Sequence, residues 1–145
     1  MKILIVEDED LAVKKLQKAL SGVDVSSQVA GVTDSIKATV EWLQQHPAPD
    51  LILMDIELAD GQSFEIFNLV EVKSPVIFTT SYDEYALKAF KVNSVDYLLK
   101  PIQKEELQAA IDKYKKLQSS FNNNKTGDAG LSIDNLVKEL QRKLQ

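Results

Sequence analysis

The feature that most constrains the fold is a regular alternation of strand-like and helix-like patterns over the first 118 residues. Short runs rich in Ile, Val and Leu are typical of buried strands, and each precedes a stretch with apolar residues at helical spacing. The strand patterns cover residues 2–6, 25–32, 51–54, 75–80 and 95–100, and the helical patterns cover residues 11–20, 36–45, 63–71, 84–92 and 104–118. Because parallel strands need long crossover connections, this alternation predicts one α/β domain over residues 1–118, with helices on both faces of a parallel sheet.

The individual patterns also predict local detail. Asp34 and Ser35 offer an N-terminal cap to the second helix, since short polar side chains accept hydrogen bonds from first-turn N–H groups. The strand over 25–32 is partly polar, so we expect it near an edge of the sheet. The residues expected on the buried sides are Leu11, Leu16, Ala19 and Leu20 of the first helix and Ile36, Val40 and Leu43 of the second.

The composition changes after residue 118. Residues 119–131 are polar, rich in Asn and contain glycine, which is typical of a flexible linker. Residues 132–145 place apolar side chains along one stripe of a predicted amphipathic helix. An isolated helix of this length is marginal in water, so we expect the stripe to pack against another surface. This helix is predicted to lead into an effector domain or to pair with its copy in a dimer.

Composition excludes several classes of function. The 145 residues include no cysteine, so disulfides and thiolate metal sites are excluded, which fits a reducing cytoplasm. The sequence has no apolar run of about 18 residues and no signal peptide, so we expect neither membrane spanning nor secretion. The formal net charge of −5 argues against a basic nucleic-acid-binding surface on this chain. An acidic chain instead indicates cation binding or protein partners, and we expect a cytoplasmic location.

Charged and hydroxyl side chains stand at the carboxyl ends of four predicted strands. They belong to Glu7, Asp8, Asp55, Thr80 and Lys100. Ligands bind beyond these ends in open parallel sheets, so we expect the side chains to converge on one crevice, with Asp55 exposed at its strand tip. Close carboxylates repel one another unless a cation intervenes, and an oxygen-rich, sulfur-free cluster suits Mg²⁺.

Each of these residues taken alone has a simpler interpretation. Glu7 and Asp8 precede a helix and would stabilise its dipole. Asp55 can be a turn residue, Thr80 an ordinary strand residue and Lys100 a charge that reaches solvent. The functional interpretation therefore depends on the fact that four strand ends each carry a residue type that the chemistry needs. Other residues are interpreted structurally: Asp50, Asp60 and Asp83 as turn residues, His46 as a solvated helix C-cap, and Trp42, Phe64 and Phe67 as core or half-buried residues.

Three motifs together resemble the receiver domain of bacterial two-component response regulators. They read "ILIVEDE", "LILMDIEL.DG" and "VIFTTSYDEYALKAFKVNSVDYLLKPI". The segments "YALKAF" and "DYLLKP" resemble in particular receivers of the LytTR type, whose full-length members carry a C-terminal LytTR DNA-binding domain. The resemblance covers residues 2 to about 117. It implies a flavodoxin-like (βα)5 doubly wound sandwich with a five-stranded parallel sheet in the order 2-1-3-4-5.

The resemblance assigns chemical roles to the strand-end residues. Asp55 would be the phosphoacceptor that attacks the phosphoryl group of a phosphohistidine on a sensor histidine kinase. Asp8 and Asp55 would hold Mg²⁺ directly together with the backbone carbonyl of Glu57, and Glu7 would act through water. Such a protein is a signalling phosphoacceptor rather than an enzyme, with only Mg-assisted self-phosphorylation and slow autodephosphorylation.

The resemblance also implies a switch. Lys100 and Thr80 would each bind a phosphoryl oxygen, and the Lys100-Pro101 peptide bond would be cis. Tyr97 would turn inward when Thr80 moves toward the phosphoryl group. The face formed by residues 84–92, 95–100 and 104–118 would then favour a homodimer.

Alternatives to this interpretation stay open. A Mg²⁺-dependent phosphatase of related topology also uses a strand-end aspartate, but it typically has a second aspartate two residues later, where this chain has Glu57. A pseudo-receiver, which is an interaction module without phosphorylation, is a third possibility. The chain lacks the length for a LytTR domain, so we expect DNA binding only through a missing C-terminal domain. We favour a piece of a longer regulator over a natural single-domain regulator with a tail.

Overall fold

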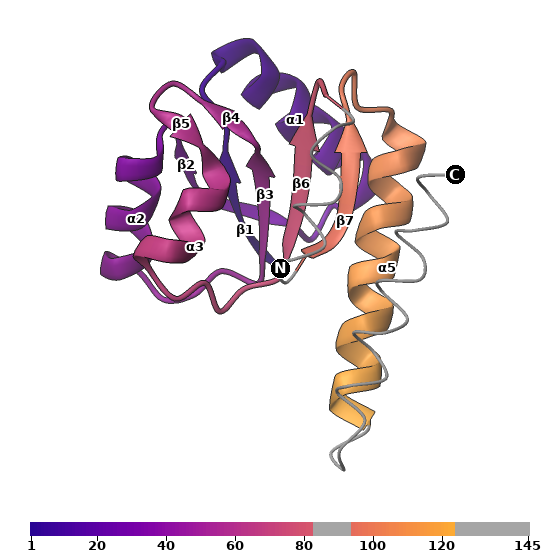
Figure 1. Cartoon of the computed structure of the whole chain (residues 1–145). Coiled ribbons are helices and arrows are strands. Elements are labelled where there is room, and N and C mark those ends of the chain that lie inside the picture. Colours follow the sequence, from indigo (N-terminus) through magenta and orange to yellow (C-terminus); the bar gives the residue numbers. More distant parts are fainter. Residues whose placement is uncertain (83–93, 124–145) are drawn as a thin grey trace.

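The computed structural model describes residues 1–82 and 94–123 and shows a five-stranded parallel sheet (Figure 1). The strands are β1 Lys2–Val6, β2 Gln28–Thr33, β3 Leu51–Asp55, β6 Val76–Thr80 and β7 Ser94–Leu99. Their order in the sheet is β2-β1-β3-β6-β7, which confirms the predicted order 2-1-3-4-5 and the doubly wound α/β fold.

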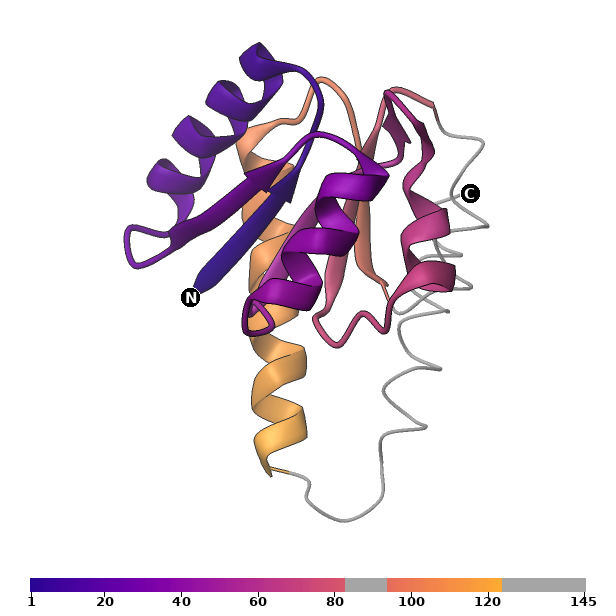
Figure 2. The same cartoon turned by 90° about the vertical axis from the view of Figure 1, so that its left-hand side faces the viewer.

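Helices cover both faces of the sheet (Figures 1 and 2). The helices α1 Asp10–Val23 and α5 Lys104–Asn123 pack on one face. The helices α2 Ile36–Gln45 and α3 Ile66–Leu69 pack on the other. Among the described helices, none combines the length and the apolar character that crossing a membrane requires.

Alternate residues of the central strands β1 and β3 face the two helix layers. In β1, Ile3 and Ile5 pack in the cluster that includes α1 and α5, whereas Leu4 and Val6 pack in the cluster that includes α2 and α3. All four side chains are buried. The apolar runs in the sequence follow from this arrangement, because a parallel strand covered on both faces has no side that tolerates polar residues.

Both ends of α2 follow the prediction. Ser35 is the N-cap, and its Oγ accepts a hydrogen bond from the Ala38 N–H at 3.0 Å. His46 is the exposed C-cap, and its backbone N–H donates to the Trp42 carbonyl. The His46 ring also stacks on the half-buried Trp42 ring with centroids 4.3 Å apart. The predicted caps of this helix are therefore confirmed.

The second strand begins later than predicted, at Gln28 rather than at residue 25. Asp24 ends α1 and accepts hydrogen bonds from the Ser26 N–H at 3.0 Å and the Ser26 hydroxyl at 2.6 Å. These bonds hold the chain in a turn, and Val25 is 94% exposed. The two serines of the predicted strand, Ser26 and Ser27, thus precede β2, which lies at the edge of the sheet as expected.

The segment after β3 also differs from the prediction. It first forms a short antiparallel hairpin of β4 Glu57–Leu58 and β5 Gly61–Gln62. The helix predicted over 63–71 is shorter, with a 3-10 turn at Ser63–Glu65 followed by α3. Val70 leaves α3 in an extended conformation and packs against the core together with Val72, which ends the helix early.

The last described helix is longer than predicted. α5 continues to Asn123, so the linker predicted over 119–131 begins too early. Residues 119–123 contain neither Gly nor Pro, and without such a breaker a helix extends at little cost. The helices predicted over 84–92 and 132–145, and the turn at Asp83, lie outside the described residues.

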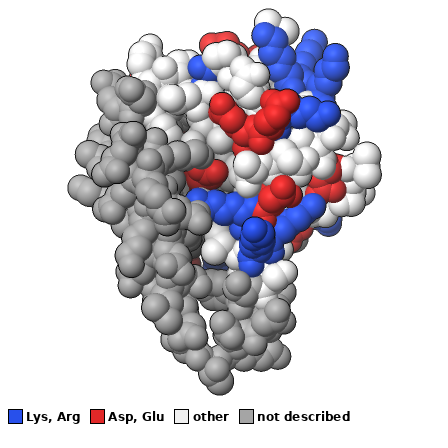
Figure 3. Space-filling model, turned by 90° about the vertical axis from the view of Figure 1, so that its right-hand side faces the viewer, with Lys and Arg blue, Asp and Glu red and all other residues white. Residues whose placement is uncertain are grey.

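Opposite charges are interspersed on the side of the molecule that carries α5 (Figure 3). One ion pair joins the two helices of this layer, with Lys115 Nζ of α5 placed 3.1 Å from Asp24 Oδ2 at the end of α1. Since basic side chains in this view alternate with acidic ones, the visible described surface does not present the continuous basic stripe typical of nucleic-acid binding.

Candidate functional site

Three carboxylates meet at the carboxyl edge of the sheet. Asp55 is the last residue of β3, and Glu7 and Asp8 follow β1, the neighbour of β3. One carboxylate oxygen from each of the three lies within 4.8 Å of the others. The chain order reverses between β1 and β3, so this acidic cluster of Glu7, Asp8 and Asp55 lies at the switch point where parallel sheets bind ligands.

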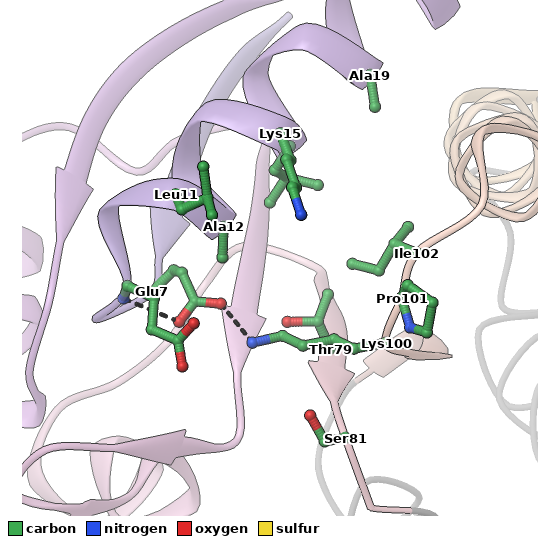
Figure 4. Close-up of a pocket in the computed structure, with 12 residues that line it drawn as sticks. Glu7, Leu11, Ala12, Lys15, Ala19, Thr79, Ser81, Lys100, Pro101 and Ile102 are labelled. Carbon is green, nitrogen blue, oxygen red and sulfur yellow. Dashed lines mark hydrogen bonds and ion pairs between the residues drawn. The ribbon is translucent and has the colours of Figure 1, made fainter.

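Lys100, directly after β7, points toward Glu7 of the acidic cluster (Figure 4). Its Nζ donates to Glu7 Oε1 at 2.5 Å and to Asp55 Oδ2 at 3.3 Å. The peptide bond between Lys100 and Pro101 is cis. The single charge of Lys100 offsets only one of the three carboxylates, so the site keeps an excess of negative charge.

Asp55 is buried, and the expectation that it would be exposed is wrong. Only 5% of its surface is accessible, and Glu7 is covered to the same extent, whereas Asp8 is exposed. Lys100 Nζ lies 3.3 Å from the Asp55 carboxylate, and Glu7 lies close enough to shift its pKa. The sequence shows that a strand ends at Asp55, but not that the Asp55 side chain is buried there beside Glu7 and Lys100.

Burial and crowding shift the ionisation of the acidic cluster. Burial raises the pKa of Asp55 to about 7, with the charge of Lys100 opposing this shift and the charge of Glu7 adding to it. Burial also raises the pKa of Asp8, and the neighbouring Glu7 carboxylate raises it further. For Glu7, burial acts to raise the pKa, but hydrogen bonds, first among them that of Lys100, hold it below its usual value.

These shifts show that the three groups do not all ionise readily beside one another. A divalent cation would relieve that repulsion, and the donors present, carboxylate oxygens with one member open to solvent, are those that Mg²⁺ prefers. The acidic cluster therefore has the chemistry to hold a metal ion.

Glu7 also orders the start of α1. Its Oε2 accepts hydrogen bonds from the backbone N–H groups of Asp8 at 2.9 Å and Glu9 at 3.3 Å. The structural interpretation of Glu7 is thus correct in part, because one oxygen serves the segment before the helix while the other holds Lys100. The two roles coexist since they use different oxygen atoms.

Thr80 and Tyr97 are both connected to Tyr82. Thr80 is the buried last residue of β6, and its Oγ1 accepts a hydrogen bond from the Tyr82 N–H at 3.2 Å. The Tyr97 hydroxyl donates to the Tyr82 carbonyl, and the Tyr97 ring is buried. Tyr97 therefore already occupies an inward position in this structure, and Thr80 and Tyr97 are linked through one residue.

A groove of about 400 Å³, which sequence reasoning missed, opens beside Lys100 between α1 and the loop after β7 (Figure 4). Its apolar lining includes Leu11, Ala12, Leu16, Ala19 and Ile102. Leu11 was expected to be buried, but it is 64% exposed at this groove, whereas Val13 is the buried residue of the first turn. The sequence does contain a signal for this exposure, because helical spacing places Leu11 on a different side of the helix from Val13, Leu16 and Leu20.

Comparison with known families identifies the part of the chain that carries the site. The model of the response regulator receiver domain family matches residues 3–112. This range contains the acidic cluster as well as Thr80, Tyr97 and Lys100.

Comparisons with individual proteins agree with the match to this family. Sensory transduction protein LytT of Bacillus cereus is 38% identical over 123 residues, which cover 83% of this chain and 49% of the relative. Transcriptional regulatory protein LytR of Staphylococcus aureus is 32% identical over 127 residues, covering 86% of this chain and 51% of the relative. The chain thus spans about half the length of these curated relatives.

Among solved structures, the response regulatory domain of protein mrkE from Klebsiella pneumoniae is similar, with a TM-score of 0.70 and 26% sequence identity. The match covers 86% of this chain and all of that domain.

Proposed function

This chain belongs to the response regulator receiver domain family of two-component systems, and from this premise we propose that Asp55 accepts a phosphoryl group from a phosphohistidine of a sensor kinase. The observation that carries the proposal is the position of Asp55 at the end of β3, with oxygens of Glu7 and Asp8 within 4.8 Å and Lys100 Nζ at 3.3 Å. Phosphoryl transfer depends on positioning and charge neutralisation more than on covalent assistance, and these groups supply both.

The transfer replaces one bond to phosphorus by another. A carboxylate oxygen of Asp55 forms a bond to phosphorus while the bond from phosphorus to the imidazole nitrogen breaks. The nitrogen keeps the electron pair of the broken bond, and the product on Asp55 is an acyl phosphate. The pKa of about 7 supports a role for a neighbouring cation, because the attacking group must be ionised.

Mg²⁺ is the proposed cofactor of this step. Asp8 and Asp55 would hold it directly, together with the backbone carbonyl of Glu57, while Glu7 would act through water. When bound, the ion would neutralise charge on the carboxylates and on the phosphoryl oxygens. The oxygen-only donor set of the acidic cluster supports this assignment over softer metals.

Lys100 and Thr80 are proposed to bind the transferred group. The Lys100 ammonium, which now pairs with Glu7 and Asp55, would contact a phosphoryl oxygen and offset its charge. The Thr80 hydroxyl accepts a hydrogen bond from Tyr82 through its oxygen, so its hydrogen can be donated to another phosphoryl oxygen. Thr80 ends β6, the neighbour of the phosphoacceptor strand β3, and Lys100 directly follows β7, the neighbour of β6.

Tyr97 is proposed to transmit the phosphorylation state. Because Tyr97 is already buried, phosphorylation would hold it inward through Thr80 and Tyr82 rather than draw it in. The face that includes β7 and α5 would then favour a homodimer. Tyr97→Ala should leave phosphorylation intact but weaken phosphorylation-dependent dimerisation in size-exclusion chromatography, whereas Tyr97→Phe, which keeps the ring, should behave closer to wild type. A dimer response unchanged in Tyr97→Ala would contradict the switch.

The proposed partners follow from the family. A sensor histidine kinase would supply the phosphoryl group in the cytoplasm, and the protein would act as a phosphoacceptor with slow autodephosphorylation rather than as an enzyme. The relative named transcriptional regulatory protein LytR supports a role in transcription regulation. We propose that this output, including any contact with DNA, is exerted by a LytTR domain outside this chain, and that residues 132–145 lead toward it.

Intact-mass measurement after incubation with acetyl phosphate tests the proposal. Wild type should gain one phosphoryl group in the presence of Mg²⁺ and none in EDTA, while Asp55→Asn should gain none in either. A gain in Asp55→Asn, or sustained turnover of phosphomonoesters by wild type as in a phosphatase, would contradict the assignment.

A further inference from the structure

The segment that follows the phosphoacceptor site is a hairpin with little internal freedom. β4 and β5 are joined by a turn of only two residues, Ala59 and Asp60. Gly61, the first residue of β5, has φ of 136°, a conformation that residues with a Cβ rarely adopt. At the base, the Ser63 N–H donates to the Ile56 carbonyl at 2.7 Å. The shape of the hairpin is therefore fixed locally, and contacts with the rest of the domain decide its orientation.

Asp60 ties this hairpin to the start of α2. Its Oδ1 accepts the Ile36 N–H at 2.8 Å, and its Oδ2 accepts the Lys37 N–H at 3.2 Å. Hydrogen bonds, chiefly that from Ile36, hold the pKa of Asp60 below its usual value. Next to it, a Cβ on Gly61 would lie 3.3 Å from Ile36 Cδ1, so the hairpin also packs closely on α2. β4 and β5 accordingly lie beside α2 in Figure 1.

These contacts exceed what capping of α2 requires. Ser35 is already the N-cap, and its hydroxyl accepts the Ala38 N–H. The first N–H groups of a helix lack partners within the helix, and water can satisfy them when they are exposed. A carboxylate that accepts two of them is held in one orientation, since each oxygen has its own donor. Asp60 thus fixes the hairpin relative to a helix more than 20 residues earlier in the chain.

We propose that Asp60 is a positioning residue for the divalent cation and acts through Glu57. This inference rests on the proposed function, in which the backbone carbonyl of Glu57 is a protein ligand of Mg²⁺. Glu57 opens β4, two residues after Asp55, so the hairpin that Asp60 anchors is the segment that presents this carbonyl. Mg²⁺ demands nearly ideal octahedral geometry, so a hairpin free to tilt would offer a poorer ligand.

Mg²⁺ titration by isothermal calorimetry tests this role, with Asp60→Ala compared with wild type. The dissociation constant should rise about 10-fold, the lower end of what loss of an outer-shell partner costs. Asp50→Ala is the matched control, because Asp50 is also an exposed aspartate that accepts a backbone N–H, that of Lys2 at 2.7 Å, but it precedes β3 rather than following it. Its dissociation constant should equal that of wild type. Asp60→Asn keeps one acceptor oxygen and should give a smaller rise, and it serves as the test if Asp60→Ala does not fold.

Two further readouts separate the possible outcomes. Urea unfolding of each variant reports the capping role, so a loss of stability with an unchanged dissociation constant for Mg²⁺ would overturn the proposal and leave Asp60 as a helix cap. Phosphoryl gain from acetyl phosphate at saturating Mg²⁺ reports the proposed function. If wild type gains a phosphoryl group while Asp60→Ala binds Mg²⁺ normally, only the positioning role is refuted. If wild type neither binds Mg²⁺ nor gains a phosphoryl group, the proposed function fails and the positioning role fails with it.

Discussion

Replacing Asp55 by Asn should stabilise the metal-free protein. The pKa of Asp55 is about 7 in the folded chain, against an ordinary value of 3.8. At about 1.36 kcal/mol per pKa unit, keeping this carboxylate ionised costs the folded state up to about 4 kcal/mol at high pH. The charge of Lys100 already contributes to this pKa, so we expect a net gain of about 4 kcal/mol at most in the free energy of unfolding.

The gain should depend on pH in a defined direction. The unfolded chain releases the Asp55 proton near pH 4, whereas the folded chain keeps it until about pH 7. The folded state therefore binds more protons between these values, so the stability that wild type owes to this group falls as the pH rises from 4 to 7. Asn does not titrate, so the advantage of Asp55→Asn should grow over this range and stay constant above it.

Urea unfolding at pH 5 and pH 8, in EDTA and in Mg²⁺, measures this effect. We expect the advantage of Asp55→Asn to be larger at pH 8 than at pH 5, and to shrink at pH 8 when Mg²⁺ binds and stabilises wild type. Asp50→Asn removes one exposed charge elsewhere and should show neither trend. A destabilised Asp55→Asn at pH 8 in EDTA, or a difference that does not vary with pH, would refute the reasoning from burial and crowding.

Three predictions concern the scaffold. Asp24→Asn should lose about 1–2 kcal/mol of stability at pH 7, since Asp24 accepts hydrogen bonds from Ser26 and pairs with Lys115. The Ser26 hydroxyl is the first of the groups that lower the pKa of Asp24 to about 2, so the loss should disappear in urea titrations as the pH falls from 4 to 2. Gly31→Ala should cost about 1–3 kcal/mol and alter tryptophan fluorescence, because a Cβ would lie 2.6 Å from Nε1 of Trp42, the only tryptophan. Ser63→Ala should leave the thermal midpoint unchanged or raise it by the equivalent of about 1 kcal/mol, because the hydroxyl is buried without a hydrogen-bond partner among the described residues.

The fold was predictable because buried parallel strands appear in the sequence as short, continuous apolar runs. The apolar runs of β1 and β3 and the helical spacing of α1 and α2 are local patterns, and the side chains at strand ends follow once the strands are placed. The Ser35 cap was predictable for the same reason, since it depends on residues within one turn.

Long-range contacts could not be predicted in this way. Asp55 is buried beside Glu7 and Lys100, which lie 48 residues before it and 45 residues after it. Asp60 was interpreted as a turn residue, which is correct, but its bonds to α2 join segments 23 and 24 residues apart. The groove beside Leu11 likewise depends on the loop after β7, which a pattern within one helix cannot show.

The most direct test of the central claim is to locate the phosphoryl group chemically. Wild type treated with acetyl phosphate and Mg²⁺ would be reduced with borohydride, which converts an aspartyl phosphate to homoserine, and then digested and sequenced by mass spectrometry. The account predicts homoserine at position 55 and at no other aspartate, and only in the sample that received Mg²⁺. Homoserine at Asp8 or another aspartate, with Asp55 unmodified, would contradict it.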